Sequence, residues 1–483
     1  MDKMKLKALE AVDAGKDILC GVSDKIWEFA ELSLLEYKST ELYVETLKKL
    51  GFTVQENLAG IETAFSGTFG SGGPVIGILA EYDALSGLSQ KGGVAERDPL
   101  VPGGNGHGCG HHLLGAGALG AAVAVKAYLE ASGKPGTVIF YGCPGEEGGA
   151  GKAFMARDGL WKKLDAALTW HPDCTNQVVT GTCNSCIQKE YIFKGRASHA
   201  AANPHAGRSA LDAVQLMNLG VEFLREHMPP SARIHYAITD AGGNSPNVVQ
   251  PGARVLYMVR DVKVSETLAI QARVDKIAEA AAMMTETELS VRFIDGTANT
   301  VPNFTLEKLL HENFEAVGVP QYDAGETAYA EAVIATYESG SGDLPGFATK
   351  YDPEIRAFVE AETKNGKIPL NTFLMPYYSS YQFEFGSTDV GDVSWLTPTA
   401  QINAVTYPAG APAHSWQQVA CGTTSIAHKG MLCAAKVLAG AAIDLFEKPE
   451  ILEKAKVEFA QKTAEGYTCP IPEDAVPVAV SEA

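Results

Sequence analysis

Hydrophobic residues in the N-terminal part of the chain recur with two alternating patterns. Helical spacing runs through residues 41–50 and 113–131, while short apolar runs occupy residues 74–83, 137–144 and 165–172. Apolar runs of this length are typical of strands that are covered on both faces. Strands that alternate with helices predict an α/β fold built on a largely parallel sheet.

The pattern changes between residues 188 and 297. Strand-like and helix-like segments follow one another there in the order β-α-β-β-α-β, with the helices predicted near 207–228 and 264–284. This order is that of a small ferredoxin-like α+β domain. We therefore predict a discontinuous catalytic α/β domain of residues 1–187 and 298–483, interrupted by an inserted ferredoxin-like domain of residues 188–297.

Composition and charge narrow the classes of function. The chain has 483 residues, of which 46% are hydrophobic and 20% charged, as expected of a folded protein with two domains. Its formal net charge of -19 would repel nucleic acid and anionic lipid, so neither is an expected partner. The N-terminal segment lacks the apolar region of a secretory signal, which predicts a cytoplasmic protein. The apolar stretch 113–125 is too short to span a membrane and predicts a buried helix.

The nine cysteines have irregular spacing and predict no disulfide framework. Cys183 and Cys186 have the spacing of a redox motif, but neither a βαβ context nor a second cysteine pair accompanies them. We expect most of the cysteines to be reduced and buried.

Polar side chains follow three of the apolar runs, at the points where the predicted strands end. Asp83 follows the first run, Glu146 and Glu147 follow the second, and His171 follows the third. Ligands of open α/β sheets bind outside the carboxyl ends of the strands. These side chains are therefore candidates for a functional site.

Two further segments supply candidate metal ligands. In GHGCGHH, Cys109 and His111 are two residues apart and would point the same way in an extended loop, with His112 opposite. His414 follows another apolar segment, in APAHSW. Thiolate, imidazole and carboxylate are the ligand types of zinc and related ions, and such a set could hold two metals that share one ligand. One of the two adjacent glutamates could then coordinate while its neighbour acts as general base.

Other interpretations of the same residues stay open. A single histidine is more often hydrogen-bonded than metal-bound, and Cys109 could be an ordinary buried thiol. Cys109 could also be a nucleophile with His111 as its base, although two positions in one loop make a poor geometry for that pair. The adjacent glutamates could be solvated charges, but the glycines that follow them weaken a helical interpretation.

Together, the motifs resemble those of one family. GHGCGHH, GCPGEEGG, TWHPD, ASHAAANPHAGRSALDA, SPNVVQP and APAHSW occur in the order found in the cysteine-containing amidohydrolase branch of the M20 family of metallopeptidases and amidohydrolases. The resemblance extends over nearly the whole chain. It implies that Glu146 is the general base and that two divalent metal ions per subunit, zinc or manganese, are bound by Cys109, His111, Glu147, His171 and His414.

The resemblance also implies a role for the inserted domain. This domain would act as a lid and would form a homodimer, in which His199 reaches the active site of the other subunit and stabilises the oxyanion. Asn247 would lie near the substrate. His112 is a departure, because the family commonly has Asp or Asn at its position. The roles of four further residues stay open: His107, Asp83, Asp389 and Asp392.

The function implied by the resemblance is hydrolysis of the amide bond of an N-acyl amino acid. The substrate that it favours is p-aminobenzoyl-glutamate, cleaved to p-aminobenzoate and glutamate. The alternatives are other N-acyl amino acids or dipeptides, or a non-catalytic subunit that supports a homologous partner. The intact Glu146 and the complete ligand set argue against a non-catalytic subunit.

Overall fold

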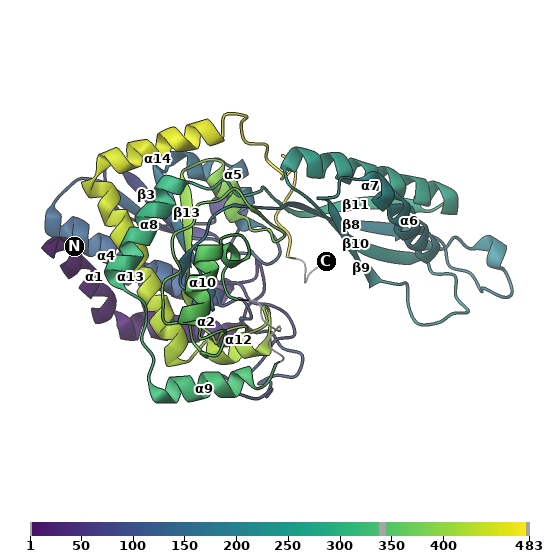
Figure 1. The fold of residues 1–483 in the computed structure, drawn as a ribbon. Coiled ribbons are helices and arrows are strands. Elements are labelled where there is room, and N and C mark those ends of the chain that lie inside the picture. The colour runs from purple at the N-terminus through teal and green to yellow at the C-terminus, as the bar shows by residue number, and fades with distance from the viewer. Residues whose placement is uncertain (1, 338–343, 480–483) are drawn as a thin grey trace.

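The computed structural model describes residues 2–337 and 344–479 and shows a large lobe from which a smaller one projects (Figure 1). The large lobe contains a seven-stranded sheet in the order β1-β2-β4-β3-β5-β13-β6. Its four central strands run parallel to one another. These strands are β4 (Gly136–Gly142), β3 (Val75–Ala80), β5 (Ala166–Asp173) and β13 (Thr399–Val405). The predicted fold class is confirmed.

The outer strands of this sheet are antiparallel to their neighbours. β1 (Thr53–Glu56) pairs with β2 (Phe65–Ser71), β2 pairs with β4, and β6 (Gln177–Val178) pairs with β13. β1 and β6 are short and partly exposed, whereas every residue of β4 is buried. The parallel part of the sheet is therefore the part that helices cover on both faces, as the long apolar runs predict.

Helices α1 (Lys3–Ala14), α4 (His111–Ser132), α8 (Phe304–Val317) and α13 (Ser425–Glu447) pack together over one face of the sheet. α4 is the one helix in the described part of the chain that is apolar and long enough to cross a membrane, but 83% of its most apolar window is buried. This burial agrees with the predicted core helix. The other face is covered by α5 (Gly151–Arg157) and α11 (Val390–Ser394).

The remaining helices of the large lobe surround this core. They are α2 (Lys16–Phe29), α3 (Tyr37–Lys49), α9 (Ala324–Ile334), α10 (Pro353–Glu362), α12 (Trp416–Cys421) and α14 (Pro449–Lys462). All nine cysteines lie within the described residues and are free thiols, and Cys183 and Cys186 are both buried. The free thiols are those that the irregular spacing of the cysteines predicts.

The small lobe has the predicted β-α-β-β-α-β order. Its antiparallel sheet has the strand order β11-β8-β10-β9, and two helices pack against it around a separate hydrophobic core. The elements in chain order are β8 (Ser185–Lys194), α6 (Ala210–Leu224), β9 (Arg233–Asp240), β10 (Gly252–Asp261), α7 (Val264–Thr285) and β11 (Glu288–Thr297). The boundaries of the two domains stay predictions.

Two segments join the lobes, one before β8 and one after β11. In the first, β7 (Thr182–Cys183) pairs with β12 (Phe383–Glu384). The second is held by residues of α11 and the position after it. Asp392 accepts a hydrogen bond from the Ala298 amide at 2.9 Å, and the Trp395 indole donates to the carbonyl of Asn299 at 2.9 Å. The small lobe is thus attached to the helix that covers the large sheet.

Candidate metal centre

The side chains that follow the central strands converge at the carboxyl edge of the sheet, as predicted. Cys109, His111 and His171 offer donor atoms that all lie within 4.8 Å of one another, and so do Cys109, Glu147 and His414. The two groups share the Cys109 thiol. All five predicted ligands are therefore brought together in an arrangement of two adjacent three-donor groups.

A turn at Gly110 brings the first group together. Gly110 has a φ of 84°, and a Cβ at this position would lie 2.9 Å from the Cβ of Pro172. His111 is the first residue of α4, and the Cys109 sulfur lies 3.3 Å from Nε2 of His171. The expectation of an extended loop was wrong, because the chain turns through the left-handed region that glycine tolerates.

His111 is held between carboxylates. Its Nδ1 lies 2.7 Å from Oδ1 of Asp83, and its Nε2 lies 3.3 Å from Glu81. Burial alone would raise the pKa of Asp83, but the His111 ring lowers it to about 2. The other oxygen of Asp83 accepts hydrogen bonds from the Glu147 amide and the Ser33 hydroxyl. Asp83 therefore orients members of both donor groups, as carboxylates behind metal-binding histidines do.

The buried donors fit divalent metal ions. Nε2 of His111 and Oε1 of Glu147 are buried and make no hydrogen bond, although the latter lies 3.4 Å from Nε2 of His414. Buried polar atoms without partners are costly, and here one belongs to each donor group. The combination of thiolate, imidazole and carboxylate is a ligand set for zinc-like ions.

The structure disfavours Cys109 as a nucleophile. Burial raises the pKa of its thiol and so favours the protonated form. A protonated thiol is a poor nucleophile, because the thiolate is the reactive form. Nδ1 of His111 pairs with Asp83 and its Nε2 lies 3.3 Å from Glu81, so the imidazole contacts two carboxylates as well as the Cys109 thiol.

Glu146 belongs to neither of the groups that share Cys109, but with Glu81 and His111 it forms a third group whose donor atoms lie within 4.8 Å of one another. One of its oxygens lies 4.0 Å from Nε2 of His111. Burial and the nearby carboxylates of Glu81 and Glu147 raise its pKa. The loop that carries it is anchored by the small lobe, because Asp295 of β11 accepts a hydrogen bond from the Gly149 amide at 3.1 Å. A carboxyl group held in this way suits proton transfer.

An ion cluster beneath the site was missed by the sequence analysis. Lys152 is fully buried, and its Nζ lies 2.6 Å from Glu81 and 2.5 Å from Asp389. Glu81 could have been found, since it lies two residues before Asp83 and thus on the same side of the extended chain. Lys152 carried no signal, because a lysine after a glycine-rich loop is usually solvated. Asp389, whose role was open, makes no side-chain capping bond and pairs with Lys152 instead.

The two other histidines of the motif lie outside the donor groups. Nε2 of His112 lies 3.1 Å from the Gly422 carbonyl oxygen, and Nε2 of His107 lies 3.0 Å from that of Ile26. The two rings pack together with centroids 4.8 Å apart. His107 and His112 therefore attach the loop to α2 and to the end of α12, and His112 is not among the grouped donors.

His199 and Asn247 lie together on the small lobe. The Ala200 amide donates to the carbonyl oxygen of Asn247 at 2.9 Å, and both of the predicted residues are exposed. His199 follows Lys194 and Asn247 precedes Gly252, and these two residues pair at the last position of β8 and the first of β10. Ten residues of β8 separate that end from the large lobe, or roughly 30 Å. Any role of these residues in catalysis stays a prediction that requires a second subunit.

Comparison with known proteins identifies the family. Residues 77–367 match the model of peptidase family M20/M25/M40, and this stretch is more than half of the chain. The chain belongs to this family. It is 44% identical to a subunit of p-aminobenzoyl-glutamate hydrolase from Escherichia coli (strain K12), with 97% of both chains covered.

More distant relatives are similar over most of the chain. The chain is 27% identical to Xaa-Arg dipeptidase of Mus musculus, over 96% of this chain and 94% of the relative. It also resembles the crystal structure of a dinuclear metal-binding M20 peptidase from Bacillus subtilis, with a TM-score of 0.53 and 16% identity, over 90% of this chain and 99% of the other. The latter similarity concerns the fold alone.

Proposed function

We propose that this M20 protein is a metal-dependent amidohydrolase that binds two divalent ions. The observation that carries the proposal is the pair of donor groups that share Cys109, with Glu146 beside them. Cys109, His111 and His171 would hold one ion, and Cys109, Glu147 and His414 the other. When bound, such ions supply Lewis acidity and lower the pKa of an attacking water.

The residues of the chain would carry the proton transfers. Glu146 takes a proton from the attacking water and later passes it to the leaving nitrogen, so the carboxyl group ends the cycle as it began. Asp83 keeps His111 in one tautomer and one orientation. Water attacks the carbonyl carbon, the carbon–nitrogen bond breaks, and a carboxylic acid and an amine leave.

The substrate that we propose is p-aminobenzoyl-glutamate, cleaved to p-aminobenzoate and glutamate. This proposal is supported by the 44% identity, over 97% of both chains, to a protein with that named activity. Zinc and manganese both suit the donor set. We place the reaction in the cytoplasm.

A second subunit would complete the site with His199. The edge strand β9 exposes Tyr236 and Ile238, and α6 exposes Leu219 and Phe223 at a spacing of four residues. Phe223 is 69% exposed. An unpaired strand edge beside exposed apolar side chains favours association with another chain. We propose a homodimer through this surface, and a homologous partner subunit could occupy the same surface, because the E. coli relative is named as one subunit of its enzyme.

The proposal is tested with the chain purified alone. The protein is stripped of metal, reloaded with zinc or manganese, and assayed with p-aminobenzoyl-glutamate, other N-acyl amino acids and dipeptides that end in arginine. We expect release of p-aminobenzoate and glutamate to be fastest. Hydrolysis of another substrate alone would overturn the substrate assignment, and no hydrolysis with either ion would support the non-catalytic alternative.

A further inference from the structure

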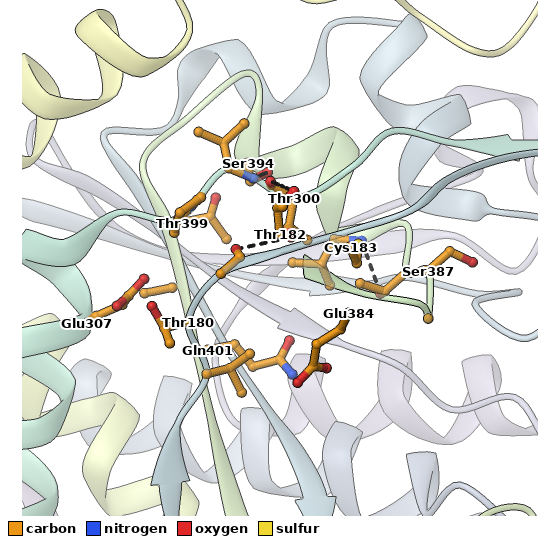
Figure 2. Close-up of a pocket in the computed structure, with 18 residues that line it drawn as sticks. Thr180, Thr182, Cys183, Thr300, Glu307, Glu384, Ser387, Ser394, Thr399 and Gln401 are labelled. Atoms are coloured by element: carbon orange, nitrogen blue, oxygen red, sulfur yellow. Dashed lines mark hydrogen bonds between the residues drawn. The ribbon is translucent and has the colours of Figure 1, made fainter. Parts of the chain in front are cut away.

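A cavity lies away from the metal centre, at the joint between the lobes. Its volume is about 220 Å³. Its walls come from the two joining segments, from α8 and α11, and from Thr399–Gln401 at the start of β13 (Figure 2). The metal centre lies at the opposite, carboxyl end of the parallel strands, and none of the lining residues belongs to the donor groups. The cavity is therefore separate from the candidate active site.

The charged residues that line this cavity are both acidic. Glu307 and Glu384 lie on two sides of it, and no Lys, Arg or His is among its lining residues in the described chain (Figure 2). The threonine, serine and glutamine side chains between them add further oxygen atoms. A wall of this kind offers oxygen acceptors to an occupant, and a cation in the cavity would favour the ionised form of its carboxyl groups.

Glu307 is deeply buried and has no cationic partner in the part of the chain that the structure describes. It is 1% exposed, and the Tyr377 hydroxyl lies 3.4 Å from one of its carboxylate oxygens. Lys462, the cation that acts on the pKa of Glu307, already bonds to Glu458 and to the carbonyl oxygen of Pro302, each at 2.8 Å. A buried carboxyl group without a counterion is costly to ionise, so a cation in the cavity would compensate for its burial.

We propose that this cavity binds a small organic cation with a primary ammonium or guanidinium group. Its charged nitrogen would donate hydrogen bonds to Glu307, and Glu384 would contribute at the more exposed side. The volume is below the usual range for drug-sized ligands, so the occupant is small. Because both joining segments line the cavity, an occupant would contact the two connections on which the position of the small lobe depends.

Binding of a cation should change the protonation state of Glu307. Burial raises its pKa to about 8. The titratable groups that face it are Tyr377, on the segment before β12, and Lys462 and Glu458 of α14. At neutral pH the carboxyl group is mostly protonated, and an entering cation favours the carboxylate. Binding should therefore release a proton to the buffer.

The test uses the full chain and 1,4-diaminobutane as the probe. Isothermal titration in buffers with different ionisation enthalpies measures both the dissociation constant and the number of protons released. The comparison ligands are 1,4-butanediol, which has the same length without charge, and potassium ion. Titration of the metal-free Glu146→Gln variant shows whether binding is independent of the catalytic site.

Two variants locate the site, and a third is the control. Glu307→Gln keeps the shape of the side chain and should weaken binding of the diamine about tenfold or more. It should also abolish proton release. Glu384→Gln, at an exposed position, should weaken binding less and without loss of folding. Glu130→Gln, on the far end of α4, should change nothing.

The proposal is supported if the diamine binds, the diol does not, and Glu307→Gln weakens binding with normal folding. It is overturned if the diol or potassium binds as well as the diamine, if Glu307→Gln and Glu384→Gln leave the dissociation constant unchanged, or if no diamine binding is detected. Binding that is lost in the metal-free Glu146→Gln protein would place the diamine in the catalytic site and would also overturn it.

Discussion

Nδ1 of His111 lies 2.7 Å from Oδ1 of Asp83, and both side chains are fully buried. This contact fixes the imidazole so that Nε2 faces the donor group with Cys109 and His171. Asp83→Asn should lower metal affinity by about 10–100-fold, as loss of such an orienting carboxylate does in metal sites. A competition titration with a chromophoric chelator measures the affinity.

The matched control is Asp24→Asn, because Asp24 also pairs with a histidine, His428, outside the donor groups. Metal affinity should stay at the wild-type value in that variant. Equal affinities in the Asp83→Asn and wild-type proteins would show that Asp83 does not orient a ligand.

Lys152 is expected to stabilise the fold through its two buried ion pairs. Replacement with methionine leaves the Glu81 and Asp389 carboxylates without their cation, so the free energy of unfolding should fall by about 3–5 kcal/mol. Urea denaturation of metal-free protein measures this change. Lys48→Met removes an exposed pair with Glu56 and should cost no more than about 1 kcal/mol. Equal losses for the two variants would contradict the interpretation.

The pair of His428 and Asp24 predicts a pH dependence of stability. Burial alone would lower the pKa of His428, but its hydrogen bonds to Asp24 and Cys20 raise it from 6.5 to about 9. Because the folded-state pKa is the higher one, the stabilisation is complete below pH 6.5 and is lost as the pH rises through about 9. The unfolding free energies of wild type and Asp24→Asn should therefore differ most at mildly acidic pH, where the imidazole is protonated and carboxylates are ionised. A difference that grows above pH 9 would refute this.

Much of the fold follows from the apolar pattern alone. The runs at 74–83 and 137–144 become β3 and β4, and the stretch 113–131 becomes α4. Their burial is dictated by continuous apolar sequence, which leaves no solvated alternative. The β-α-β-β-α-β order of the small lobe was predictable for the same reason.

Relationships between distant residues could not be predicted in this way. β13 joins β5, and Lys152 meets Asp389, across more than 200 positions of the chain. Local periodicity carries no information on such pairings, because they depend on how the elements pack. Glu146, Glu147 and His171 became candidates because they follow apolar runs, whereas the full set of five ligands came from the resemblance to the M20 family. The turn at Gly110 and the separation of His199 from Cys109 depend on backbone geometry that the spacing does not encode.

The role of His199 in a second subunit predicts complementation between inactive variants. Glu146→Gln and His199→Ala should each be nearly inactive alone. Mixed dimers of the two contain one site with both wild-type residues, so random exchange should restore about a quarter of the wild-type activity. Activity is measured after the variants are mixed and allowed to exchange subunits.

The control for this experiment is Phe223→Asp in both variants, since this exposed side chain lies on the proposed dimer surface. It should prevent recovery and shift the mass measured by light scattering to that of a monomer. No recovery from dimers that demonstrably exchange would rule out the action of His199 in the other subunit.

Hydrolysis of p-aminobenzoyl-glutamate by two metal ions and Glu146 is tested by following the release of p-aminobenzoate. Metal-free protein receives zinc or manganese in known equivalents, with Glu146→Gln in parallel. We predict that activity rises until two equivalents per chain are bound, and that Glu146→Gln binds the same two equivalents with turnover reduced by at least about 100-fold. Full activity without metal, or near-normal turnover by Glu146→Gln, would contradict this mechanism.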